Sequence, residues 1–456
     1  MLGLNNKLDS LQREGKTINV AIAGVGQMGK GLISHMRDLK GFKVLAVANR
    51  DIERTAKIAG ELGIKKSEAF VTGSEDNISD KNITIEKITA EGGIVHRNIK
   101  KQLDEAVKEG KIIITNDLFY ISAIEDVDVV LDATGSPAAG AYIALNSIAC
   151  KKNVVSLNVE ADVTIGPILK KFADRYGIVY TVSAGDEPGA LKELYDFSDA
   201  LGLEVVAAGK GKNNPLNRYA NPTTLAEYAA AKGSSARMMT SFVDGTKSMI
   251  EMACVSNATG LVPDCIGMHG PKANVTDLVE IFKLKKDGGI LEKKGVVDFA
   301  IGDIAPGVFL VYTTNNEIIK KDLKYLQLGE GPNYLLYRSY HLTSIETPLS
   351  IARVYFYNEP TIVPKGGLVS DVITAAKRDL KAGEVIDGIG GYTVYGLIEL
   401  YRNAKEESLL PIGLAEGSTL KRDIKKDQTI KYDDIEFSCD SLLLELRKLQ
   451  DKSFPG

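Results

Sequence analysis

Several features that mark common classes of protein are missing from this chain of 456 residues. Its 4 cysteines show no C-x-x-C spacing, so they indicate reduced, mostly buried thiols rather than a disulfide framework. Its 4 histidines are scattered without the spacing of metal ligands. No apolar run approaches the roughly 18–20 residues of a membrane span, and the N-terminus lacks a signal-peptide core. We therefore expect a cytoplasmic protein.

An excess of positive charge is also missing. The formal net charge of −4 argues against a dedicated nucleic-acid binder. The chain has neither a G-x-S-x-G nucleophile elbow nor a Walker A loop, so Ser/His/Asp hydrolysis and P-loop phosphoryl transfer are not indicated. The 44% hydrophobic and 25% charged content is typical of a soluble globular protein, and the length predicts two or three domains.

The most informative feature that is present is a strand–turn–helix–strand unit at residues 17–50. Residues 24–29 fit the motif G-x-G-x-x-G between an apolar, β-prone run and a helix-compatible run. Gly24 would permit the tight turn, Gly26 would let the backbone approach a pyrophosphate, and Gly29 would let helix and strand pack closely. The new helix N-terminus would present N–H groups to the phosphates. This context predicts dinucleotide binding, and the alternative is a glycine-rich turn with an empty site.

The end of the second strand favours one dinucleotide. An NAD site usually has Asp or Glu there, whereas this strand ends with Asn49 and Arg50. A neutral Asn tolerates a 2′-phosphate and Arg50 could pair with it, which favours NADP(H). The alternative is an ordinary surface arginine, and Asp51 next to it weakens the case. The predicted cofactor-binding residues come from this unit and from the strand end at 133–135: Gly24, Gly26, Gln27, Met28, Gly29, Asn49, Arg50, Ala133, Thr134 and Gly135.

The rhythm of predicted elements divides the chain into three parts. Strands and helices alternate over residues 1–185, which predicts an α/β fold with a doubly wound Rossmann sheet. Residues 186–362 read as an α+β catalytic and dimerisation domain, with one helix over 239–256 and strands at 203–208, 308–313 and 351–357. Residues 363–456 form a small β-rich region in which a K-R-D-[LI]-K core occurs twice, at 377–381 and 421–425.

Polar side chains follow several of the predicted strands. Residues 158–166 carry Glu160 and Asp162, which could bind a divalent metal or act as acid–base partners. The alternative is that Asp162 caps a helix over 164–176. Asp186 and Glu187 follow the next strand and could equally cap a helix or coordinate a ligand.

Two lysines follow the strand at 203–208. Lys210 and Lys212 would lie on a glycine-flexible turn, where a lysine beside a carbonyl can stabilise a developing alkoxide. The alternative is a solvated basic turn. Farther on, Asp244, Lys247 and Glu251 would share one face of a helix, either reaching into a cleft or forming an exposed charge ladder. We expect His341 to be a packed core histidine.

These stretches together resemble one family, the homoserine-dehydrogenase-like oxidoreductases with a C-terminal SAF domain. Some of its members are the DXR-like (type II) 1-deoxy-D-xylulose 5-phosphate reductoisomerases of isoprenoid biosynthesis. The resemblance covers most of the chain, whereas the polar stretch 65–98 departs from the family pattern. It implies NADPH as cofactor, a homodimer and a mixed range of substrates. The stretches that carry it are residues 24–29, 132–137, 158–166, 183–189, 209–215, 240–251 and 340–348.

We therefore predict an NADP-dependent oxidoreductase acting on a small polar hydroxycarbonyl compound, with a reductoisomerase slightly ahead of a simple dehydrogenase. A divalent metal, Mg²⁺ or Mn²⁺, stays open as a second cofactor. The non-enzymatic alternative is a dinucleotide-sensing or carbohydrate-binding protein. The predicted catalytic residues are Glu160, Asp162, Lys210, Lys212, Asp186 and Glu187. The predicted substrate-binding residues are Asn158, Ser183, Asn213, Asn214, Asp244 and Lys247, and Ser234, Ser235 and Arg237 are phosphate partners by residue type.

Overall fold

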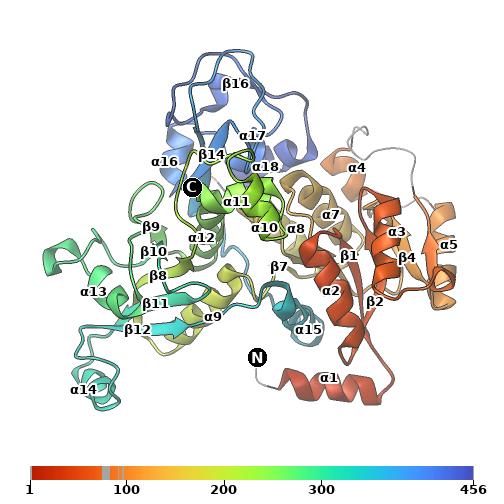
Figure 1. Cartoon of the computed structure of the whole chain (residues 1–456). Helices are drawn as coiled ribbons and strands as arrows, with labels where there is room; N and C mark the ends of the chain where they lie inside the picture. The colour runs from red at the N-terminus through yellow and green to blue at the C-terminus, as the bar shows by residue number, and fades with distance from the viewer. Residues whose placement is uncertain (1–2, 74–82, 91, 95–96, 455–456) are drawn as a thin grey trace. The chain divides into compact units, whose positions relative to one another are not determined.

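The computed structural model describes residues 3–73, 83–90, 92–94 and 97–454 (Figure 1). The polar, turn-rich stretch at residues 75–80 lies outside the described residues. The chain divides into two compact units, each assembled from separate segments. Unit 1 comprises Met1–Asp186, Leu342–Val363 and Asp440–Ser453. Unit 2 comprises Glu187–His341, Pro364–Cys439 and Phe454–Gly456.

Unit 1 contains a sheet of 7 strands in the order β3-β4-β2-β1-β5-β6-β7. All neighbouring strands are parallel, as expected when each strand is followed by a covering helix. The order reverses at β1, where parallel sheets of this kind bind their ligands. The strands are β1 (Ile18–Ala23), β2 (Phe42–Ala48), β3 (Ala69–Val71), β4 (Ile112–Thr115), β5 (Val129–Asp132), β6 (Asn153–Ser156) and β7 (Tyr180–Val182).

Helices from three parts of the chain belong to unit 1. One of them, α15 (Thr347–Tyr357), corrects the strand that we expected over residues 351–357. Its β-branched and aromatic residues suggested a strand, but Pro348 stands in its first turn and Ile351, Ala352 and Val354 enter the core beside β1 and β2. The other helices of unit 1 are α1 (Leu4–Arg13), α2 (Gln27–Asp38), α3 (Ile52–Glu61), α4 (Ile85–Ala90), α5 (Arg97–Lys108), α6 (Tyr120–Ala123), α7 (Pro137–Ala149), α8 (Val159–Tyr176) and α18 (Leu442–Ser453).

Unit 2 contains a mixed sheet of 5 strands in the order β12-β11-β8-β10-β9. Its central strand continues through Lys212, so the expected flexible turn at 209–215 is wrong. Gly209 and Gly211 serve close packing instead, because a Cβ at these positions would lie 2.5 Å from the Asp298 carbonyl oxygen and 2.2 Å from the Ala305 nitrogen. The strands are β8 (Glu204–Lys212), β9 (Val262–Pro263), β10 (Val296–Ile301), β11 (Val308–Thr313) and β12 (Asn333–Arg338).

The single helix expected over residues 239–256 is two helices. Gly245 lies between them with φ +88°, a conformation in which the helix cannot continue. The second helix, α12 (Thr246–Thr259), is buried along almost its whole length and packs on α9 (Glu187–Ala200). The remaining helices are α10 (Ala226–Ala231), α11 (Ala236–Val243), α13 (Leu278–Ile281) and α14 (Glu317–Tyr325).

The C-terminal part of unit 2, residues 370–436, is called the SAF-like region below. The two copies of the repeated sequence core pair with each other in it, because Leu380 and Ile424 exchange both backbone hydrogen bonds, at 2.8 and 3.0 Å. Around this pair, Lys381 binds Asp423 at 2.7 Å. The repeat is therefore a local two-fold pairing. The elements of the region are β13 (Ser370–Ala376), β14 (Val394–Leu400), β15 (Thr419–Leu420), β16 (Ile435–Glu436), α16 (Tyr401–Glu406) and α17 (Ile412–Ala415).

The structure confirms the expected fold class: a Rossmann-type parallel sheet, a mixed α+β region and a small β-rich C-terminal region. Among the residues described, no helix combines the length and the apolar character needed to cross a membrane.

Candidate active site

The glycine motif of unit 1 forms an open turn between β1 and α2. Gly24 has φ +96°, and a Cβ there would lie 2.6 Å from the Ala133 carbonyl oxygen. A Cβ on Gly29 would lie 1.9 Å from the Gly24 carbonyl oxygen, so neither glycine tolerates a side chain. Gly26, by contrast, is exposed, and a Cβ there would meet nothing within 4 Å. This open backbone at a helix N-terminus fits a pyrophosphate, and the neighbouring Gln27 and Met28 are exposed beside it.

The end of β2 presents one exposed cation. Arg50 is exposed, whereas Asn49 is half-buried and its amide donates to Thr55 Oγ1 at 3.2 Å. Asp51, which weakened the sequence argument for NADP(H), is the N-cap of α3, and its carboxylate accepts from the Arg54 backbone N–H at 2.8 Å. Asp51 therefore has a structural role that does not depend on a ribose.

The strand ends of β5 and β6 are joined by a closed polar network. The amide of Asn158 donates to Asp132 Oδ2 at 2.9 Å and to the Ser136 carbonyl oxygen at 2.8 Å, and its oxygen caps α8 by accepting from the Ala161 N–H at 3.1 Å. Burial raises the pKa of Asp132, and the hydrogen bonds from Thr134 and Asn158 oppose that rise. The side chain that we expected to bind substrate is thus engaged within the fold.

The acids that follow Asn158 lie inside α8. The helix begins at Val159, and Asn158 is its cap, so the alternative role of Asp162 as the cap is wrong. Glu160 and Asp162 are both buried, and the Tyr180 hydroxyl donates to Asp162 Oδ1 at 3.2 Å. Ser183 is also buried, and its hydroxyl hydrogen-bonds Thr347 Oγ1 at 2.9 Å. The catalytic role of the two acids and the substrate role of Ser183 stay predictions.

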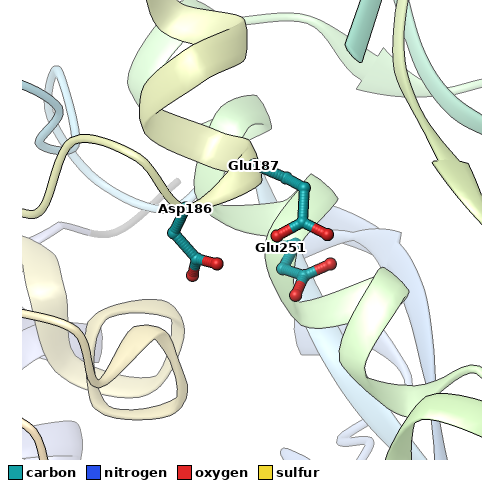
Figure 2. A group of neighbouring side chains, drawn as sticks. All are labelled: Asp186, Glu187 and Glu251. Atoms are coloured by element: carbon teal, nitrogen blue, oxygen red, sulfur yellow. The ribbon is translucent and has the colours of Figure 1, made fainter. Parts of the chain in front are cut away.

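A buried cluster of charges in unit 2 joins β8, α9 and α12. Lys210 points from β8 between Glu187, the first residue of α9, and Glu251 of α12. Figure 2 shows the two glutamates side by side. Its ammonium lies 2.5 Å from Glu187 Oε1 and also binds Glu251 Oε2. The three residues are 4%, 8% and 1% exposed. A cation between two carboxylates compensates charges that would otherwise be unstable inside the protein.

The same cluster contains the one set of acids, among the described residues, with the spacing of a metal site. Asp186, Glu187 and Glu251 each offer a carboxylate oxygen within 4.8 Å of the others (Figure 2). Two of these carboxylates already bind Lys210. A divalent ion at these acids would therefore compete with the Lys210 ammonium for the Glu187 and Glu251 carboxylates.

The two lysines of β8 have opposite electrostatic properties. Burial alone would lower the pKa of Lys210, but the charges of Glu187 and Glu251 outweigh it and raise that pKa. For Lys212, burial and the neighbouring Lys210 lower the pKa to about 8. Burial, together with the charge of Glu187, raises the pKa of Glu251. Lys212 is therefore the lysine of the pair whose proton can exchange near neutral pH.

Two residues of this site did not emerge from the sequence as site residues. His341 was expected in a core, yet its Nε2 lies 3.5 Å from Glu187 Oε2 and its Nδ1 lies 2.5 Å from the Pro306 carbonyl oxygen. Glu251 was expected on a charged helix face, either reaching into a cleft or exposed, and was not among the predicted site residues. A carboxylate inside the apolar run from Met249 to Ala253 was the available signal, since a lone charge in a buried helix needs a partner.

The other residues expected to bind substrate are dispersed over unit 2. Asp244 is not on the face of Glu251, because it ends α11, and it pairs with Lys377 at 2.8 Å. Lys247 is half-buried and lowers the pKa of Glu251. Arg237 donates to the Ile389 carbonyl oxygen at 2.9 Å. Asn213 and Ser235 are exposed, Ser234 is half-buried and Asn214 accepts from the Tyr228 hydroxyl.

Three family models match separate parts of the chain. Residues 185–347 match the catalytic domain of oxidoreductase DRL, residues 7–119 match shikimate / quinate 5-dehydrogenase, and residues 372–436 match the SAF domain. No curated protein gives a significant sequence match.

Solved structures of several oxidoreductases are similar at low identity. A probable dehydrogenase from Thermotoga maritima is 12% identical with a TM-score of 0.40, over 76% of this chain and 90% of that one. DOX-P reductoisomerase in complex with NADPH, fosmidomycin and magnesium is 14% identical with a TM-score of 0.40, over 77% and 71% of the two chains. Scyllo-inositol dehydrogenase from Lactobacillus casei, with NAD(H) and scyllo-inositol, is 14% identical with a TM-score of 0.36, over 71% and 76%. The matched catalytic domain supports an oxidoreductase.

Proposed function

We propose that this chain is an NADP(H)-dependent oxidoreductase that acts on a small polar hydroxycarbonyl compound in unit 2. The observation that carries the proposal is the pair of lysines on β8. Lys212 has a pKa near 8, and it stands two residues from a Lys210 that stays charged between Glu187 and Glu251. Both lysines lie within the segment that matches an oxidoreductase catalytic domain.

The proposed roles follow from these charges. The nicotinamide supplies a hydride to the carbonyl carbon when NADPH is bound. The carbonyl oxygen takes on negative charge as the hydride arrives, and Lys212 donates the proton that neutralises it. Lys210 keeps its proton and acts as a fixed positive charge that stabilises the alkoxide before protonation. In the reverse direction, neutral Lys212 accepts the hydroxyl proton.

The proposed cofactor site is the open turn at Gly26 in unit 1. Its backbone would hold the pyrophosphate at the N-terminus of α2, where no side chain fills the space around Gly26. Arg50 would bind the 2′-phosphate, since its guanidinium is exposed and Asp51 is engaged as a helix cap. This arrangement supports NADP(H) over NAD(H).

The geometry of the cluster favours simple hydride transfer, since the Lys210 ammonium already binds both Glu187 and Glu251. A reductoisomerase is the second candidate, and the spacing of Asp186, Glu187 and Glu251 supports it. Rearrangement of a hydroxyketone phosphate would use those acids and a divalent metal. The two candidates therefore differ in whether Lys210 or a metal ion holds the carboxylates.

NADPH oxidation separates these candidates. The full chain is assayed with a panel of hydroxyaldehydes and hydroxyketones that includes 1-deoxyxylulose 5-phosphate, with Mg²⁺, with Mn²⁺ and with EDTA. Turnover that survives EDTA supports the dehydrogenase, and turnover of the phosphate ester only with metal supports the reductoisomerase. Tight NADPH binding without turnover on any compound contradicts both and favours the dinucleotide-sensing alternative.

We also propose a homodimer, and the surface around α14 is where we expect the second copy. No residue of α14 is buried, and Ile318, Tyr325, Leu326 and Leu328 are 68%, 85%, 62% and 51% exposed. Large apolar side chains gathered in one short segment are typical of association surfaces. The neighbouring β12 is an edge strand, whose free backbone groups can pair with another copy. Sedimentation of the wild type and of Tyr325→Glu tests this: the variant should be a monomer, and an unchanged dimer would place the interface elsewhere.

A further inference from the structure

The turn between α11 and α12, residues 242–246, connects two parts of unit 2. Gly245 gives it a left-handed conformation with φ +88°, and Asp244 Oδ1 accepts from the Thr246 N–H at 2.8 Å. Asp244 and Thr246 are buried, at 1% and 0% exposure. The turn is therefore held in one conformation. The positions of the side chains that contact it, from β8 and from the SAF-like region, depend on its position.

The SAF-like region holds this turn through two buried contacts. Lys377, next to the end of β13, places its ammonium 2.8 Å from Asp244 Oδ2. The same ammonium donates to the carbonyl oxygens of Ala220 and Gly391, each at 2.8 Å, so three oxygens in all surround it. From β14, the Gly396 N–H donates to Thr246 Oγ1 at 2.9 Å. A buried charge with defined partners specifies position more strictly than an apolar contact.

The other side of the turn holds Lys212. The Phe242 carbonyl oxygen accepts from the Lys212 ammonium at 2.5 Å, and the Lys212 side chain is buried with it. The carbonyl of Val243 accepts from the Asn217 N–H at 2.9 Å, which ties the turn to the segment that follows β8. The place of the Lys212 ammonium thus depends on the place of the turn.

We propose that Lys377 is a positioning residue for Lys212: the SAF-like region fixes the turn at 242–246 through Lys377 and Gly396, and the turn fixes the ammonium through the Phe242 carbonyl oxygen. The importance of this for catalysis rests on the proposed function of Lys212. The positioning itself rests only on contacts within unit 2. It gives the SAF-like region a role in the reaction although that region holds no proposed catalytic group.

The charges around Lys212 decide what loss of Lys377 does. Burial and Lys210 lower the pKa of Lys212, while Glu251 and Asp244 raise it. Lys377 faces Asp244 from the SAF-like region, and burial raises the pKa of Asp244 while Lys377 lowers it. Removing Lys377 takes away a positive charge, which would raise the Lys212 pKa. It also favours neutral Asp244, and the loss of that negative charge would lower the Lys212 pKa. Release of the turn, which exposes the ammonium to water, therefore decides the direction, and the Lys212 pKa rises towards its ordinary value.

Competitive labelling of lysines with acetic anhydride across pH tests this on the full chain, with mass spectrometry reading the Lys212 peptide. Only the neutral amine reacts, so the midpoint of labelling reports the pKa without any assay of activity. In Lys377→Met we expect the Lys212 midpoint to rise by about one unit. The matched control is Lys381→Met, which removes a lysine of the same region from an exposed pair with Asp423. A midpoint equal to that of the wild type in Lys377→Met, or an equal shift in Lys381→Met, overturns the inference.

Two further variants test the same proposal if Lys377→Met does not fold. Lys377→Met with Asp244→Asn removes both charges and leaves no carboxylate unpaired. Thr246→Val removes the hydroxyl that contacts Gly396 and Asp244 and keeps Lys377, and we expect a smaller rise of the Lys212 midpoint in the same direction. Loss of the Asp244 charge by itself lowers the Lys212 pKa, so if neither variant raises the midpoint, Lys377 does not position Lys212. A shifted midpoint with no NADPH turnover on any substrate sinks the proposed function alone, and turnover that needs Lys212 with an unmoved midpoint sinks the positioning alone.

Discussion

Unit 1 and unit 2 each bury a polar cluster beside a strand end, and the two clusters have opposite character. In unit 1, Asn158 meets Asp132, Ser136 and the start of α8 with every polar atom of its amide engaged. In unit 2, Lys210 holds two carboxylates, while the adjacent Lys212 has a carbonyl partner and a lowered pKa. A polar cluster in which hydrogen bonds satisfy each member stabilises the fold. A cluster that contains a group with a pKa near neutral pH, as Lys212 has, is suited to proton transfer.

The largest expected effect tests this contrast at Lys212. Lys212→Met keeps an unbranched side chain out to Cε and removes the ammonium that donates the proton. We expect kcat/KM for carbonyl reduction to fall about a thousandfold, within the range typical of a lost general acid. Steady-state NADPH oxidation measures it, and Lys381→Met is the exposed control. A fall of less than tenfold would remove Lys212 from the proposed chemistry.

The second-largest expected effect is the dependence of stability and of carbonyl reduction on pH, through the titration of Lys212. Its folded pKa of about 8 lies below the value of 10.5 for an ordinary lysine, so the unfolded chain holds more protons between these values. Stability should therefore rise with pH from about 8 to 10.5, by at most about 3.4 kcal/mol relative to Lys212→Met. Carbonyl reduction should fall above pH 8 as the donor loses its proton. Denaturant unfolding at several pH values checks the first statement, and parallel curves for the two proteins would contradict it.

A smaller effect is expected in the closed cluster of unit 1. Asn158→Ala removes the cap of α8 and leaves Asp132 Oδ2 without its amide donor, which should lower the free energy of unfolding by about 1–3 kcal/mol. The folded fraction should keep its kcat, because the cluster serves the fold. Urea unfolding and kinetics on the same preparation measure the two quantities. A large loss of kcat at wild-type stability would place Asn158 in the substrate site after all.

The smallest expected effect concerns the cofactor. Arg50→Ala should raise the Kd of NADPH about tenfold and leave that of NADH unchanged, because a single charge-assisted contact to the 2′-phosphate is lost. Fluorescence titration with both dinucleotides measures the ratio, and Arg54→Ala on the adjoining helix is a matched control. Equal weakening of both dinucleotides would mean that Arg50 does not read the phosphate.

Local sequence patterns were enough to predict most of the fold. The glycines at 24–29 predicted the turn between β1 and α2, because backbone conformation at a turn depends on a few adjacent residues. The failures came where distant neighbours decide. The glycines at 209 and 211 read as flexible, yet they lie within β8 because β10 and the segment at 304–305 press against them. The segment of α15 was predicted as a strand from its β-branched and aromatic residues. It is a helix because burial of one face in the core, and not those residues, sets its structure.

The sequence by itself determined a Rossmann-type unit with an open glycine turn, a repeated core in the SAF-like region, and lysines and acids worth testing. Those features need only the identity and spacing of neighbouring residues. Only the tertiary structure decided that Lys210 lies between Glu187 and Glu251, that Asp244 pairs with Lys377, and that the two repeats bind each other. Proton affinity inside a protein depends on charges and burial that distant parts of the chain supply, so these pairings had to be seen in space.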